Sequence, residues 1–392
     1  MLSHEVALKR APTDCRPGLR IGRADADELK TENWKSKTEN STVKVVEFLA
    51  VQFWGVVRNP TNMWRAVLSR AKKSWRVSLG AGILGALVLA FRYAVRPISR
   101  PKLPETISPA IFATRLLPTS RGQIIYHESG QGEPLLFVHG VYVGASSYEW
   151  SKVYPFFAGT YRTMAMDLLG FGESERPNQP LSAADHVDVL AQFLRAKSDN
   201  EPATIVASGF GAGFAAMLAA QHPDLVQRLI LVMPIAEVAG IPRRYRIISK
   251  FPLFKRPLYR RHISGHAQVK KWLERYAFAQ ADAVTMEDVN VISYLAQQWG
   301  AEYAVFRWLS GRFDLDLERR LSEIPHPVTL IWGDKVSYPP LEQAYRLQPV
   351  ARRCSLVVME NTGLLPGLES PRTMIDVLSR ELDRTIRVFK AG

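Results

Sequence analysis

The chain has 392 residues, which suits one large domain with appendages and allows a sizeable buried core. Apolar residue types make up 47% and charged types 22%, which excludes collagen-like, wholly disordered and multi-span membrane classes, and the two cysteines, Cys15 and Cys354, form neither a disulfide framework nor a metal cluster. Lysine and arginine exceed aspartate and glutamate by 51 to 37, a net charge of +14 that suggests nucleic acid or an anionic membrane surface as a partner.

The basic excess is local. Residues 48–104 contain ten basic residues and no acid, and residues 241–275 contain eleven basic residues and one acid, Glu274. The rest of the chain is therefore slightly acidic. Because aromatic residues are interleaved with the second stretch, we expect it to face anionic lipid headgroups. The candidates for this membrane-surface contact are Arg256, Arg260, Arg261, Lys270 and Lys271.

Four segments are predicted before the main domain. Residues 1–40 are polar with mixed charges, which predicts a disordered tail, and residues 41–76 show an aromatic and basic pattern typical of amphipathic interfacial helices. Residues 77–95 are predicted to form a transmembrane helix, although the uncharged part, residues 77–91, spans only ~22 Å of a hydrocarbon core of roughly 30 Å. A buried core helix is the alternative. Residues 96–110 form a proline-rich linker.

From residue 111 onward, short apolar runs alternate with helical patterns. Such runs between helices are typical of a parallel α/β sheet. The expected strands are IIYH, LLFVH, YRTMAMD, ATIVAS, RLILVM, PVTLIW and SLVVM. The sequence therefore predicts one α/β domain over residues 111–392.

Five strings of this domain resemble the α/β-hydrolase family, in the order that the family has them. They are LLFVHG with VYVGASSYEW, MDLLGFGESERP, IVASGFGAGFAAMLAAQHPDLVQRLILVMP, PVTLIWGDKVSYPP and VVMENTGLLPGLESP. The resemblance implies a mostly parallel sheet flanked by helices, with a helical cap inserted after the sixth strand over residues 235–324. It also implies catalysis by a nucleophile, a carboxylate and a histidine held in hydrogen-bond reach.

The three positions at which the family carries this triad hold other residues here. The nucleophile position between Ala207 and Gly211 is Gly209, the acid position is Val336, and the histidine position is Leu364. The last histidine of the chain is His326, so the final loop has none. Ser208 is the alternative nucleophile, but the residues two places to either side of it are bulky for a tight strand-to-helix turn.

The residues around the expected turn still resemble a pocket of the family. The pocket and oxyanion candidates are His139, Gly140, Val141, Tyr142, Ser208, Gly209 and Phe210. The backbone amides of Phe210 and of Val141 or Tyr142 are expected to bind an anionic oxygen, while His139 is expected to be structural. The spacing of the remaining histidines and acids predicts no metal site, and we expect no cofactor.

Two functions are compatible with these residues. The first is a membrane-anchored pseudohydrolase, single-pass or interfacially anchored, that binds an apolar or acyl-bearing ligand or a partner without hydrolysing it. The alternative is an esterase-like hydrolase, or a cofactor-free lyase or oxygenase, with a displaced catalytic set. Nucleic-acid binding has no supporting motif. The sequence leaves the ligand, the side of the membrane and the oligomeric state open.

Overall fold

The computed structural model describes residues 111–236, 259–308 and 315–390, with Gly85, Pro109 and Arg256 as single positions and side chains up to Asp383. The predicted tail, interfacial helices, transmembrane helix and linker therefore lie outside the described residues, apart from Gly85 and Pro109. Among the residues that are described, no helix is both long and apolar enough to cross a bilayer.

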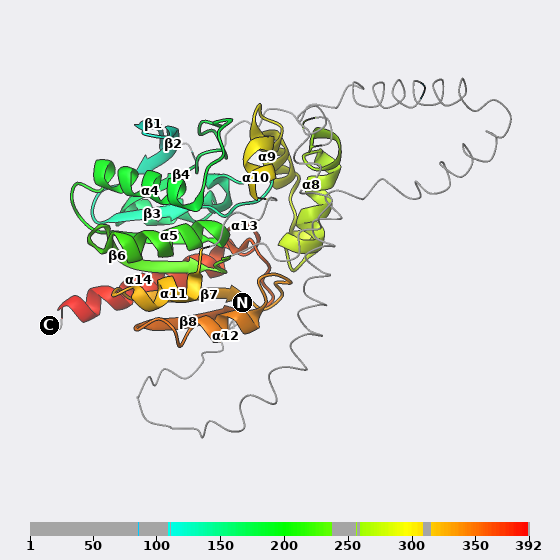
Figure 1. Cartoon of the computed structure of the whole chain (residues 1–392). Coiled ribbons are helices and arrows are strands. Elements are labelled where there is room, and N and C mark those ends of the chain that lie inside the picture. Colours follow the sequence, from blue (N-terminus) through cyan, green and yellow to red (C-terminus); the bar gives the residue numbers. More distant parts are fainter. Residues whose placement is uncertain are drawn as a thin grey trace, which may run out of the picture.

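An eight-stranded sheet forms the centre of the described part (Figure 1). Its strand order is β1-β2-β4-β3-β5-β6-β7-β8; β1, β2 and β4 pair antiparallel, and every neighbouring pair from β4 to β8 is parallel. The strands are β1 (Ala113–Thr119), β2 (Gly122–Ser129), β3 (Pro134–Val138), β4 (Arg162–Met166), β5 (Ala203–Ser208), β6 (Val226–Val232), β7 (Val328–Gly333) and β8 (Cys354–Met359). The expected mostly parallel α/β sheet is confirmed.

The central strands are apolar runs because both faces of the sheet are covered. Every residue of β3, β5 and β7 is buried, which is why these strands read as continuous runs rather than alternating patterns. The sequence did not predict β1. This strand lies at the edge of the sheet, most of its residues are exposed, and it contains Pro118, which an edge position tolerates.

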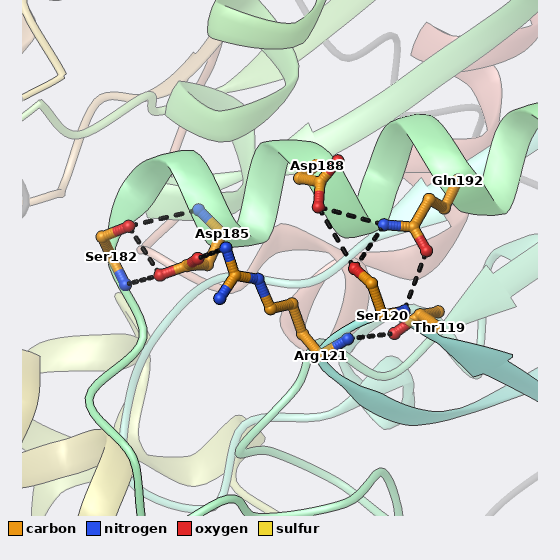
Figure 2. Close-up of polar contacts among 7 residues, drawn as sticks. All are labelled: Thr119, Ser120, Arg121, Ser182, Asp185, Asp188 and Gln192. Carbon is orange, nitrogen blue, oxygen red and sulfur yellow. Dashed lines mark hydrogen bonds and ion pairs between the residues drawn. The ribbon is translucent and has the colours of Figure 1, made fainter.

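Helices flank the sheet. They are α4 (Ala183–Lys197), α5 (Gly209–Gln221), α12 (Leu341–Leu347), α13 (Pro366–Glu369) and α14 (Pro371–Lys390), with short 3-10 turns η1 (Ser147–Trp150), η2 (Tyr154–Gly159) and η3 (Pro223–Leu225). A capping box between Ser182 and Asp185 starts α4, and Asp185 also pairs with Arg121 of the turn between β1 and β2 at 2.8 Å (Figure 2). These contacts attach the antiparallel hairpin to the parallel part of the domain.

A helical segment stands between β6 and β7. Its described elements are α8 (His266–Trp272), the π-helical turn η4 (Leu273–Ala277), η5 (Ala281–Ala283), α9 (Met286–Ala296), α10 (Ala301–Trp308) and α11 (Leu317–Glu323). Figure 1 shows α8, α9 and α10 gathered beside the sheet, away from β8 and α14. We call the described residues of 259–308 the inserted helices. They fall within residues 235–324, where a helical cap was expected.

Candidate functional site

The sharp turn from β5 into α5 is the centre of the candidate site. Ser208 is the last residue of β5, and Gly209, the first of α5, has φ +52, in the left-handed region that favours glycine. A Cβ at Gly209 would meet only ordinary contacts, 3.5 Å from Gly140 Cα and 3.9 Å from Ile235 Cδ1. A Cβ at Gly211 would clash with the carbonyl oxygen of His139. The turn thus brings α5 against the loop that follows β3.

A buried carboxylate lies beneath this turn. Glu149, in η1, accepts a hydrogen bond from the Ser208 hydroxyl through Oε1 and one of 2.9 Å from the Gly140 backbone N–H through Oε2. Tyr142 also hydrogen-bonds the carboxyl group. Glu149 is 1% exposed. Three elements, the loop after β3, η1 and the end of β5, therefore converge on one acidic group.

Burial dominates the electrostatics of this group. Removal from water raises the pKa of Glu149 to about 7, although the hydrogen bonds from Ser208, Gly140 and Tyr142 favour the charged form. Burial and the neighbouring Glu149 carboxylate raise the pKa of Tyr142 well above its ordinary value, so this phenol keeps its proton at neutral pH. Glu149 therefore changes charge near neutral pH while its neighbours act as donors.

His139 is held by the backbone on both ring nitrogens. Its Nε2 accepts a hydrogen bond of 3.0 Å from Leu168 N–H, which leaves Nδ1, 2.6 Å from the Gly140 carbonyl oxygen, as the donor. Burial lowers its pKa, so the neutral ring is favoured. This geometry gives His139 the role of fixing the loop after β3.

The expected anion-binding amides lie on both sides of the turn. Val141 N is 4.0 Å from the place that a Cβ of Gly209 would take, and Phe210 is buried in the first turn of α5. Val141 and Phe210 thus lie on the two segments that Gly209 and Gly140 bring together. Their role as an oxyanion pair stays a prediction.

The loops after β7 and β8 serve as structural connections. Asp334 accepts a hydrogen bond of 3.3 Å from Thr362 N–H and pairs with Lys335 at 3.3 Å, while Val336 packs against the core. Leu364 N–H donates to the Ala277 carbonyl oxygen at 2.6 Å. The loop that ends in Leu364 is therefore docked on the end of η4, and the assignment of Val336 and Leu364 as triad positions stays a prediction.

A family model of the alpha/beta hydrolase family matches residues 135–377, which is more than half of the chain. The chain belongs to this family. The matched residues run from β3 through η1, the β5–α5 turn and the inserted helices to β8. The match therefore covers both Glu149 and Ser208.

Named relatives in the family are hydrolases. The chain is 23% identical over 269 residues to 2-hydroxy-6-oxo-6-(2'-aminophenyl)hexa-2,4-dienoic acid hydrolase of Metapseudomonas resinovorans, covering 68% of this chain and 90% of that protein. It is 28% identical over 254 residues to 2-hydroxymuconate semialdehyde hydrolase of Pseudomonas sp. (strain CF600), covering 60% and 82%. The solved epoxide hydrolase CorEH shares the fold, with a TM-score of 0.57 and 19% identity over 69% of this chain and 98% of that chain.

The expectation of a membrane-anchored, non-catalytic pseudohydrolase is wrong. The named relatives described above are hydrolases, which contradicts a non-catalytic role. The segment that was expected to form the anchor lies outside the described residues. The expectation weighed only the three triad positions, and an acid from another loop can take part in catalysis when the fold brings it to the same turn. Hydrolysis with a displaced catalytic set, the alternative, agrees better with the family.

Sequence reasoning missed Glu149. One signal could have found it: between Pro134 and Tyr161 the only charged residues are Glu149 and Lys152, so an acid stands alone in an apolar stretch. Lone acids in such stretches are buried only when they are paired. Among the five membrane-surface candidates, Lys270 is exposed and the other four are half-buried, with Arg256 paired to Glu302 at 3.9 Å. Their contact with a membrane surface stays a prediction.

Proposed function

We propose that this protein is an esterase-like hydrolase whose catalytic set is displaced from the usual positions of the family to Ser208 and Glu149. The observation that carries the proposal is the hydrogen bond from the Ser208 hydroxyl to a buried carboxyl group whose pKa is about 7. A general base works best when its pKa lies near the working pH. A hydroxyl paired with such a base meets the requirement for an activated nucleophile.

The proposed reaction has two halves: the first forms an acyl-enzyme and the second hydrolyses it. Ser208 Oγ attacks the acyl carbon, its proton passes to the ionised Glu149, and the carbonyl oxygen becomes an oxyanion. Collapse of this intermediate breaks the bond to the leaving alcohol, which takes the proton back from Glu149. Water then attacks the acyl-Ser208 carbon with Glu149 again as the base, and Ser208 Oγ leaves with the proton. The two halves release an alcohol and a carboxylic acid.

The space left by the missing side chain at Gly209 is the proposed binding place for the acyl group of the substrate. Ser208 is 4% exposed, so the acyl carbon has to approach through the space where other family members carry a side chain at the turn. The Val141 backbone nitrogen lies 4.0 Å from that space, and its N–H is the proposed donor to the developing oxyanion. The Ile235 side chain, with Cδ1 3.9 Å from that space, is apolar, which favours an apolar acyl group as the substrate.

The test measures hydrolysis of p-nitrophenyl acetate and butyrate by the full-length chain. Ser208→Ala and Glu149→Gln should each lower kcat by roughly 100-fold or more, because each removes a partner of the same proton transfer. Ser198→Ala is the matched control, since Ser198 is a buried serine at the end of α4, before β5 begins, whereas Ser208 ends β5, and this variant should keep full activity.

Covalent labelling gives a second measurement. A fluorophosphonate probe should modify the wild-type chain at Ser208 and leave Ser208→Ala unmodified. Full hydrolysis by both variants, or labelling of another serine, would reject the displaced set.

A further inference from the structure

The inserted helices reach the loop that carries Glu149 through a fully buried acid. Asp288, in the first turn of α9, accepts a hydrogen bond of 2.9 Å from the Tyr148 hydroxyl and an ion pair of 2.9 Å from Lys152 Nζ. Tyr148 directly precedes Glu149 in η1, and Lys152 follows just after it. The two partners of Asp288 thus stand on either side of Glu149 along the chain.

Asp288 has a second set of bonds that fixes its own position. Its Oδ2 accepts from the Thr285 hydroxyl at 2.6 Å and from Thr285 N–H at 3.3 Å, which closes a capping box at the start of α9. The contacts with Thr285 therefore fix the Asp288 carboxylate on α9, independently of its contacts with the η1 segment. A residue held in this way can transmit the position of α9 to Tyr148 and Lys152.

A second inserted helix contacts the other neighbour of Glu149. Trp272, at the end of α8, stacks on Tyr142 with ring centroids 5.1 Å apart and an interplanar angle of 27°. Tyr142 is the residue that hydrogen-bonds the Glu149 carboxyl group. The carboxyl group is thus enclosed by α8 through Tyr142 and by α9 through Tyr148.

We propose that Asp288 is a positioning residue for Glu149, and that α8 and α9, through Trp272 and Asp288, keep water away from this carboxyl group. The inference rests on the proposed function for its kinetic consequences only. Its structural consequence, the environment of Glu149, can be measured without any substrate.

Among the described residues, few charged or titratable groups belong to the segments that surround Glu149. They are His139 and Tyr142 of the loop after β3, Tyr148 and Lys152 of the η1 segment and Asp288 of α9. The residue of β5 that contacts the Glu149 carboxylate is Ser208, which is uncharged. The residue of α13 that lies against the Glu149 backbone is Gly367, which has no side chain. If η1 loosens, the main change at Glu149 is access of water.

The experiment uses the full chain labelled with 13C at the glutamate carboxyl carbon, with Glu149→Gln to assign the signal. In the wild type the carboxyl signal should titrate near pH 7. In Asp288→Ala the pKa of Glu149 should fall toward about 4.3, the ordinary value of a glutamate, because the loop opens to water. Asp288→Asn should stay near the wild type, since its amide oxygen still accepts the Tyr148 hydroxyl.

Kinetics supply the second readout. With p-nitrophenyl butyrate, Asp288→Ala should lower kcat roughly 10- to 100-fold and change KM little, as expected when a catalytic group is misplaced rather than removed. Glu302→Ala is the matched control, because Glu302 is a buried acid of α10 that pairs with Arg256 within the inserted segment. This control should leave both the pKa of Glu149 and kcat unchanged.

The outcomes separate the two proposals. An unchanged pKa of Glu149 in folded Asp288→Ala, or an equal change in Glu302→Ala, overturns the positioning role whatever the kinetics. Unaltered hydrolysis by Ser208→Ala overturns the proposed function, while the titration of Glu149 in the Asp288 variants still decides the positioning role.

Discussion

His139 and Leu168 are joined by a hydrogen bond of 3.0 Å from the Leu168 backbone N–H to the Nε2 atom of the imidazole. This bond links the loop after β3 to the loop after β4, and it uses the ring nitrogen that a catalytic histidine would need for proton transfer. The histidine that the chain retains beside the turn therefore holds the site in shape and leaves the role of base to another group.

The variant His139→Leu should destabilise the fold. It removes one partner each from the Leu168 N–H and the Gly140 carbonyl, which are buried, and leaving such groups unsatisfied costs roughly 2–4 kcal/mol in total. Urea unfolding followed by fluorescence measures this loss. An unfolding free energy equal to that of the wild type would show that the two backbone groups find other partners.

Hydrolysis should depend on the ionisation of Glu149. Because burial raises its pKa to about 7, the base is protonated and inactive below this pH. We expect kcat/KM for p-nitrophenyl butyrate to rise with pH and to level off above about 7. A profile that is flat between pH 5 and 8 would contradict the role of Glu149 as the base.

The difference in unfolding free energy between Glu149→Gln and the wild type should shift in favour of the variant as the pH rises. The pKa of Glu149 is about 7 in the folded chain and about 4.3 when unfolded, so its favourable contribution is present below about 4.3 and is lost as the pH rises through 7. Relative to the value at pH 4, the variant should gain roughly 3 kcal/mol at pH 8 in urea unfolding. No change in the difference between the two proteins with pH would contradict this.

His186 should make the fold sensitive to acid. Its ring stacks on Phe214 with centroids 4.7 Å apart, and burial lowers its pKa to about 4. In the unfolded chain a histidine binds a proton below about 6.5, so acid favours unfolding between pH 6.5 and 4 by up to about 3 kcal/mol. His186→Phe should lose this part of the pH dependence of the unfolding free energy. The same dependence in both proteins between pH 6.5 and 4 would exclude this role of His186.

The packing of α13 on η1 predicts that Gly367→Ala is harmful. A Cβ at Gly367 would lie 2.6 Å from the Glu149 carbonyl oxygen and 3.0 Å from the Trp150 ring, so η1 has to shift. Both stability and hydrolysis should fall. Gly159→Ala is the matched control, because a Cβ there would meet nothing within 4 Å, and a variant of Gly367 that behaves like this control would show that η1 yields without cost.

The sequence by itself determined the sheet and the turn. Apolar runs such as ATIVAS predict buried strands because both faces of a parallel sheet are covered, and β5 is buried throughout. The small residues around Gly209 predict a tight turn, and φ +52 agrees with this. These features are local, since each depends on residues that are neighbours in the chain.

Only the tertiary structure decided which polar groups meet. Glu149 and Ser208 are 59 residues apart, and Asp288 and Tyr148 are 140 residues apart, yet each pair is hydrogen-bonded. Sequence spacing carries no information on such contacts, because they depend on how strands and inserted helices pack in space. The raised pKa of Glu149 has the same origin: burial is a property of everything that surrounds the carboxyl group, and no single segment of the chain specifies it.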